Sequence, residues 1–229
     1  MKKFICLVLL LVTCVIFIDA CSSKLAEQMQ SSIAEVHYNI YVGASDEVSC
    51  TYSGGKREQT YLLNGYSTPL VDFGLLTFVV DNTNATDDTP TFTLNYNNTT
   101  LDGVLEKNPY DGSYVADIRK IIDNVPNMIA TIRMGSYTKS INLLPISPNW
   151  KITYNDALQI AIQQNKKLIK NLFVRNKNFE GEIYIKVLHD HTNNGTDIYY
   201  WFVSVLGRDG NKLGVLVDNM TGKIVATKR

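Results

Sequence analysis

The alternation of apolar and polar positions is clearest near the C-terminal end of the chain. Residues 198–206 are rich in aromatic and β-branched side chains, which suit the pleated surface of a sheet. Asp209-Gly210 follows, a dipeptide typical of tight hairpin turns. A returning strand over residues 213–217 and a second turn at Gly222 complete the pattern. We therefore expect antiparallel strands joined by short hairpins in this stretch.

The first of these strands is apolar on both of its faces. Because side chains alternate along a strand, Tyr199, Trp201 and Val203 share one face, and Tyr200 and Phe202 share the other. Two apolar faces predict that each is at least partly covered by another part of the protein.

A helix upstream is the expected cover for one face. Thr153 and Asp156 form the pattern of a capping box, with Asp in place of the usual Glu. Apolar residues then recur at helical spacing, at Ala157, Leu158, Ala161, Ile162, Leu168, Ile169, Leu172 and Phe173. Residues 181–189 alternate as a strand. The predicted order is therefore one long helix followed by an antiparallel sheet.

Residues 34–146 show short alternating runs separated by turn-forming clusters. The runs occupy residues 35–42, 47–52, 58–63, 70–80, 91–96, 100–106, 128–134 and 137–143. Short strands at this spacing predict an antiparallel β-sandwich, immunoglobulin-like in architecture but without the Cys-Trp-Cys pattern of true immunoglobulin domains. Pro145 and Pro148 form a stiff connection, and we place a second domain after it, over residues 150–229.

The second domain resembles the PepSY family in its element order and its last hairpin. The matching positions are Ala157, Ile160 and Ala161, then Val217, Asp218, Thr221, Gly222, Lys223 and Ile224. The resemblance implies a small helix-on-antiparallel-sheet fold, in an exported or envelope-associated module that binds or regulates other proteins, sometimes by restraining peptidases. It implies no catalytic residues. The expected fold class is therefore α+β, with a β-sandwich followed by a PepSY-like domain.

The N-terminus has the pattern of an export signal. Lys2 and Lys3 precede an unbroken apolar run over residues 4–18, which is 15 residues long. That length is short for a membrane span and typical of a signal peptide. We expect a signal peptide over residues 1–20 and, over residues 21–33, a polar segment that is a short tether or a fraying helix.

Ile18-Asp19-Ala20-Cys21 resembles the bacterial lipobox, in which the cysteine is lipidated and becomes the new N-terminus. Asp19 departs from the small or apolar residue usual at that position. The resemblance implies a protein anchored by lipid on Cys21 at the extracytoplasmic face of the membrane. Plain secretion and an uncleaved anchor are the alternatives.

The role expected of Cys50 depends on that choice. If Cys21 carries lipid, Cys50 is a lone thiol, and if the protein is secreted the two cysteines can form a disulfide. A secreted eukaryotic protein would also use glycosylation sequons as acceptor sites. These sequons are at Asn84, Asn97, Asn98, Asn194 and Asn219.

Charge separates the two parts of the chain. The formal net charge is zero, so composition gives no reason to expect nucleic acid as a partner. Residues 21–150 nevertheless carry 8 Lys/Arg and 14 Asp/Glu, whereas residues 151–229 carry 12 and 7. Opposite signs favour two separate units.

Candidate chemistry is sparse. His189 and His191 are weak metal candidates, because a His-x-His pair on a strand faces one side, but the surrounding residues are typical of a polar loop. Residues 81–88 gather oxygen side chains that suit calcium, yet lack the glycine and distal Glu of an EF-hand. His37 fits a hydrogen-bonded histidine within a sheet. Without a catalytic motif in its required context, we expect neither an enzyme nor a cofactor.

These observations favour a non-enzymatic envelope protein that binds a protein or peptide. Aromatic side chains are enriched at binding hot spots, and the candidate binding face comprises Tyr199, Trp201, Val203 and Lys223. The alternative is an extracytoplasmic protein that binds a small molecule or a metal.

Overall fold

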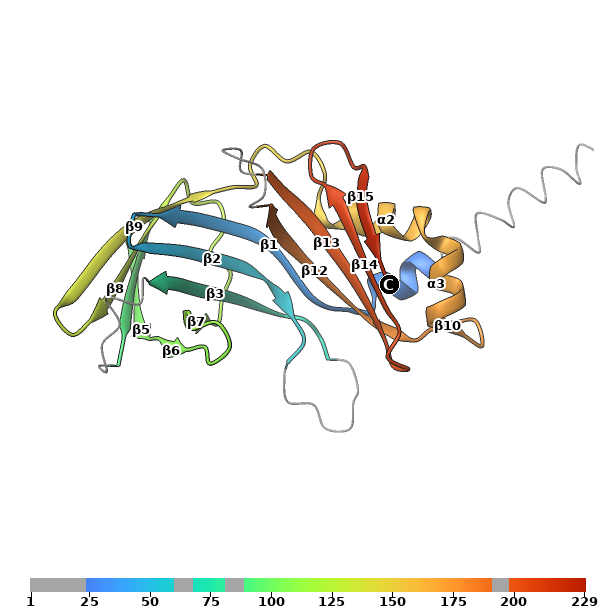
Figure 1. The fold of residues 1–229 in the computed structure, drawn as a ribbon, viewed down its shortest axis with the longest axis horizontal. Helices are drawn as coiled ribbons and strands as arrows, with labels where there is room; N and C mark the ends of the chain where they lie inside the picture. The colour runs from blue at the N-terminus through green and yellow to red at the C-terminus, as the bar shows by residue number, and fades with distance from the viewer. Residues whose placement is uncertain (1–23, 60–67, 81–88, 191–197) are drawn as a thin grey trace, which may run out of the picture. The chain divides into compact units, whose positions relative to one another are not determined.

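The chain divides into two compact units in a computed structural model, which describes residues 24–59, 68–80, 89–190 and 198–229 (Figure 1). The central unit comprises Glu35–Lys151. The terminal unit combines the residues up to Ala34 with Ile152–Arg229, so it contains both ends of the described chain.

The central unit is built from antiparallel strands. In chain order they are β1 (Ile33–Ala44), β2 (Val48–Arg57), β3 (Val71–Val80), β4 (Thr91–Tyr96), β5 (Thr99–Val104), β6 (Glu106–Lys107), β7 (Tyr114–Ile118), β8 (Met128–Met134) and β9 (Tyr137–Pro145). β1 begins two residues before this unit, within the terminal unit. Buried residues alternate with more exposed ones along β2, β4 and β7, as expected for strands that line a core.

The expected β-sandwich is wrong, because the strands are not divided between two separate sheets. β9 pairs with β8 on one side and with β1 on the other, where Tyr41 is opposite Pro145 and Val42 is opposite Leu144. This pairing joins the adjacent strands β5-β4-β8-β9 to the adjacent strands β1-β2-β3-β7-β6 in one sheet. Alternation in the sequence identifies the strands, but it does not identify their neighbours.

The terminal unit contains the helices. Residues 24–30 are helical, and α2 (Tyr154–Gln164) and α3 (Lys166–Phe173) follow the central unit. The strands are β10 (Val174–Arg175), β11 (Asn178–Phe179), β12 (Gly181–Asp190), β13 (Ile198–Gly207), β14 (Lys212–Asp218) and β15 (Ile224–Lys228). β12 to β15 form consecutive antiparallel hairpins, with α2 and α3 to one side of them (Figure 1).

The expected separate PepSY-like domain is also wrong. β12 to β15 belong to the same hydrogen-bonded sheet as the strands of the central unit, a sheet of 13 strands among the described residues. Strands make up 56% of the described residues and helices 14%, so the protein is mostly β rather than α+β. β1 links these strands, since β12, β2 and β9 all pair with it.

Two buried tyrosines organise the core of the central unit. The Tyr52 hydroxyl accepts a hydrogen bond from the Ile122 backbone N–H at 2.8 Å and donates to the Lys120 carbonyl at 3.3 Å. The Tyr41 hydroxyl bonds both backbone groups of Val125, at 3.1 and 3.3 Å. Burial raises the pKa of Tyr52, so its hydroxyl stays protonated and can donate. These bonds hold the segment between β7 and β8 against the sheet.

The predicted start of α2 is confirmed. The Thr153 side chain accepts a hydrogen bond from the Asp156 backbone N–H, and the Asp156 carboxylate accepts one from the Thr153 backbone N–H, which completes a capping box. The hydrogen bonds that the Thr153 hydroxyl and then the Thr153 backbone N–H donate to the Asp156 carboxylate lower the pKa of Asp156. One face of α2 is buried, through Ala157, Leu158, Ala161 and Ile162.

The residues that precede β1 also pack into the terminal unit. Leu25 and Met29, one helical turn apart, are 5% and 0% exposed. Gln30 Nε2 donates to Asn155 Oδ1 of α2 at 2.9 Å, and the Ser32 carbonyl accepts from the Ile183 N–H of β12 at 2.9 Å. Where the sequence suggested a polar tether, residues 24–32 therefore form part of a folded core.

We predict that Tyr52→Phe lowers the free energy of unfolding by about 1–3 kcal/mol, because it leaves the buried Ile122 N–H without its acceptor. Urea denaturation followed by circular dichroism measures the change. Tyr110→Phe is the matched control, since the Tyr110 side chain is almost fully exposed. Equal stability of the two variants would contradict the role assigned to Tyr52.

Candidate functional site

One face of β13 is covered by α2. Trp201 and Val203 lie on this face and are buried, and α2 packs against β13 and β14. The Trp201 indole N–H also donates a 2.8 Å hydrogen bond to the carbonyl of Ile152, which precedes α2. Both residues were predicted to form a binding face, and the structure places them in the core of the terminal unit instead.

The other two residues of the predicted face are more accessible to solvent. Tyr199 is half-buried and stacks on His189 of β12, with 4.5 Å between the ring centroids. Lys223 is exposed in the turn between β14 and β15. There, burial acts to raise the pKa of Asp218, but hydrogen bonds from Thr221 and the charge of Lys223 outweigh it and lower that pKa. The structure does not bring the four predicted residues onto one surface.

The metal and calcium candidates receive no support within the described parts of the chain. His189 stacks on a tyrosine, while His191 lies outside the described residues. Among the residues that the structure describes, no group of three or more His, Cys, Asp and Glu side chains could hold a metal ion. The calcium candidate at residues 81–88 also lies outside them.

The opposite face of β12, β13 and β14, turned away from α2, is the best candidate surface. It presents half-buried or exposed aromatic and aliphatic side chains, and we call it the aromatic face: Tyr184, Leu188, Tyr200, Phe202, Leu206 and Leu216. Leu188 and Leu206 are 43% and 36% exposed. Among the described residues, the chain therefore presents large apolar groups on the sheet face opposite the one that α2 covers.

A glycine positions the central ring of the aromatic face. A Cβ on Gly214 would lie 2.8 Å from Cε2 of Phe202, so the ring lies across the backbone of the neighbouring strand. Phe202 also belongs to a row across four strands, in which it is opposite Lys186 and Leu216, and Leu216 is opposite Ala226. The alternation predicted that Phe202 faces away from Trp201, and a glycine in a strand was the signal for close approach of another group.

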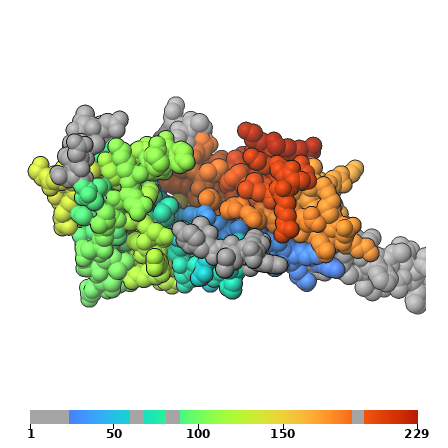
Figure 2. Space-filling view, turned by 90° about the horizontal axis from the view of Figure 1, so that it is seen from below, coloured from blue at the N-terminus to red at the C-terminus, as the bar shows by residue number. Residues whose placement is uncertain are grey.

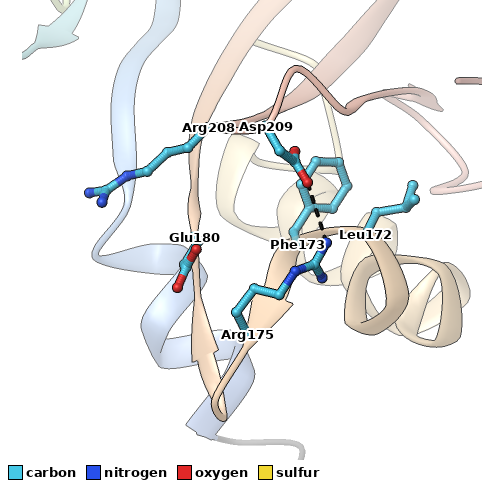
Figure 3. A pocket seen from close by; sticks show the side chains of 6 residues that line it. All are labelled: Leu172, Phe173, Arg175, Glu180, Arg208 and Asp209. Atoms are coloured by element: carbon cyan, nitrogen blue, oxygen red, sulfur yellow. Dashed lines mark hydrogen bonds and ion pairs between the residues drawn. The ribbon is translucent and has the colours of Figure 1, made fainter.

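A pocket with a volume of about 260 Å³ lies between α3 and the β13–β14 hairpin. It is lined by Leu172, Phe173, Arg175, Glu180, Arg208 and Asp209 (Figure 3). Arg175 points toward Asp209, with 3.3 Å from Nη2 to Oδ2, and Arg208 extends away from the Phe173 ring (Figure 3). Asn211 Nδ2 bonds both Asp209 Oδ2 and the Leu172 carbonyl. The ion pair and the hydrogen bonds of Asn211 therefore connect the end of α3 and β10 to the β13–β14 hairpin.

The central unit contains a chain of hydrogen bonds that resembles a catalytic triad in its order. His37 Nδ1 lies 2.6 Å from Ser53 Oγ, and His37 Nε2 lies 2.5 Å from Glu35 Oε1. The His37 ring is largely buried and packs edge-on against Phe73. Ser53 lies within a regular strand pair, opposite Ile40, and β1 is bulged just before this point. Both ring nitrogens of His37 therefore have hydrogen-bond partners, as the sequence suggested, next to the bulge in β1.

The predicted signal peptide and the predicted lipidation site at Cys21 lie outside the described residues. Within the described ranges, no helix has both the length and the apolar character needed to cross a bilayer. Comparison of the chain with protein families, with curated proteins and with solved structures found no match in any of the three.

We predict that iodoacetamide modifies Cys50 only when the protein unfolds. Cys50 is a free thiol, 1% exposed, and burial raises its pKa, so the reactive thiolate is scarce and shielded. Mass spectrometry after alkylation at pH 8, with and without denaturant, measures the modification. Rapid labelling of the native protein would contradict the burial of Cys50.

Proposed function

We propose that this protein is exported, anchored by lipid on Cys21 at the extracytoplasmic face of a membrane, and binds a protein or peptide without catalysing a reaction. The binding site that we assign is the aromatic face of the terminal unit. The observation that carries this proposal is the contrast between the two faces of β13: one is buried under α2, and the other presents Tyr200 and Phe202.

The chemistry of the aromatic face supports binding. Aromatic side chains supply large contact areas at little cost in conformational entropy, and they dominate the energetics of many interfaces. Phe202 is held across Gly214, and the sheet beneath it is fixed by the core on its other side. A preordered surface loses less entropy on binding than a mobile loop does.

The sequence supports the export and the anchor. The run of apolar residues after Lys2 and Lys3, together with Ala20-Cys21, has the composition of a cleaved signal followed by a lipid acceptor. A lipid on Cys21 would keep the aromatic face near the membrane, where an envelope protein or peptide is within reach.

We predict that Phe202→Ser weakens the binding of peptides selected on the mature protein by at least about tenfold, the usual loss at a hot spot. Peptides are selected from a random display library, and fluorescence anisotropy measures the dissociation constants. Val79→Ser is the matched control, since Val79 is an exposed strand residue of the central unit. Unchanged binding by Phe202→Ser, or a failure to select any peptide, would contradict the assignment of the aromatic face.

The proposed lipid anchor on Cys21 leads to a separate prediction. In a Gram-positive host, the N-terminal peptide of the mature protein should start at Cys21 and carry the mass of a diacylglyceryl group. Cys21→Ser should abolish that mass. An unmodified N-terminus at or beyond Cys21 in the wild-type protein would refute the lipid anchor and favour secretion.

A further inference from the structure

We infer that the terminal unit docks on anionic lipid through a basic patch made of Lys24, Lys167, Lys170, Arg175 and Lys177. The placement of this patch beside an anchored membrane rests on the proposed lipidation of Cys21. The affinity of the patch for anionic lipid does not depend on the lipid anchor, and the two can be tested separately.

The patch is concentrated in one stretch of the fold. Residues 166–179 contain five Lys/Arg and no Asp or Glu. They form α3 and the turn that joins β10 to β11. Lys167 and Lys170, three positions apart on α3, share its exposed side. Arg175 and Lys177 follow in the strand and turn directly after the helix, where both are exposed.

The N-terminal helical segment brings Lys24 to the same region. Gln28 Nε2 lies 3.4 Å from the Lys177 carbonyl, and Gln28 Oε1 accepts a 3.3 Å hydrogen bond from the Phe179 N–H. Lys24 precedes Gln28 by one helical turn and therefore lies on the same side of the helix. The blue surface of the N-terminal residues adjoins the orange surface of the terminal unit (Figure 2).

Within the described part of the chain, no ion pair neutralises the lysines of the patch. Among the residues that the structure describes, Lys24, Lys167, Lys170 and Lys177 form no ion pair, while Arg175 pairs with Asp209 at 3.3 Å. Glu27 and Glu180 are the acidic residues that flank the patch along the chain, and they leave an excess of positive charge.

The fold itself does not require these charges. The helix dipole favours a cation in the last turn of α3, which accounts for Lys170. Lys167 lies in the first turn, where the same dipole disfavours a cation. We therefore attribute the remaining charge to an external anionic partner.

We assign that partner as lipid because of the short distance between Lys24 and the proposed anchor. Three residue steps separate Cys21 from Lys24, and even a fully extended chain spans only about 10 Å over that length. Burial of Leu25 and Met29 fixes the following helical segment to the terminal unit. The patch would then be held near the distance over which salt screens charges, about 8 Å at physiological ionic strength. A basic patch combined with a lipid is a known route to stable membrane anchoring.

The experiment uses the mature chain with Cys21→Ser, which cannot carry the lipid. Sedimentation with vesicles of phosphatidylcholine, alone or with one-third phosphatidylglycerol, measures partitioning at low and high salt. The patch variant is Lys167→Glu, Lys170→Glu and Lys177→Glu. The control variant is Lys151→Glu, Lys212→Glu and Lys228→Glu, which changes the net charge equally at exposed positions outside the patch.

We expect binding to the phosphatidylglycerol vesicles only, lost at high salt. The patch variant should bind roughly 100-fold more weakly, since each cation near an anionic surface contributes about fivefold, and the control variant should change little. Equal losses in the two variants would overturn the proposal, because net charge alone would then explain binding. No binding of the parent chain would also overturn it and would leave an acidic protein as the partner of the patch. Neither result depends on the N-terminal mass, which tests the anchor.

Discussion

The packing of the N-terminal helical segment against the terminal unit is the interaction on which the rest of the structure depends. Met29 is completely buried, Leu25 and Ile33 are nearly so, and the Ser32 carbonyl is bonded to β12. These contacts link the beginning of the described chain to elements about 120 to 150 residues further on. The terminal unit can form its full core only after both ends of the chain are present.

This constraint explains why β1 is long. Its 12 residues begin in the terminal unit and continue through the central unit, where the strand pairs with β2 and β9. β1 contributes Ile33 and Ala34 to the buried residues of the terminal unit, and Val36, Ile40 and Tyr41 to those of the central unit.

The local elements could be predicted from the sequence, but the pairing of strands far apart in the chain could not. The hairpins from β12 to β15 and the capping box of α2 depend on near neighbours, and their residues show the pattern directly. The sandwich and the separate PepSY-like domain were wrong because strand pairing depends on contacts far apart in sequence. The spacing of Leu25 and Met29 was a signal for a helix in the expected tether, but two apolar positions in a polar stretch are weak on their own.

The same limit applied to the candidate site. Alternation assigned Trp201 and Phe202 to opposite faces, and both faces were equally apolar. Which face α2 covers depends on the side of the sheet on which the helix lies, and the sequence pattern does not encode that side. Gly214, on which the Phe202 ring lies, and the hydrogen bonds of Gln28 became visible only when the strands and helices were placed together.

The central feature of this structure is that residues 24–34 are part of a folded core and not a tether. Hydrogen exchange of the backbone amides, measured by mass spectrometry on the mature protein, tests this most directly. We expect peptides covering residues 24–34 to exchange as slowly as those from β12 and β13, because all of them open together with the terminal unit. Exchange of residues 24–34 at the rate of an unfolded chain, with β12 and β13 protected, would contradict it.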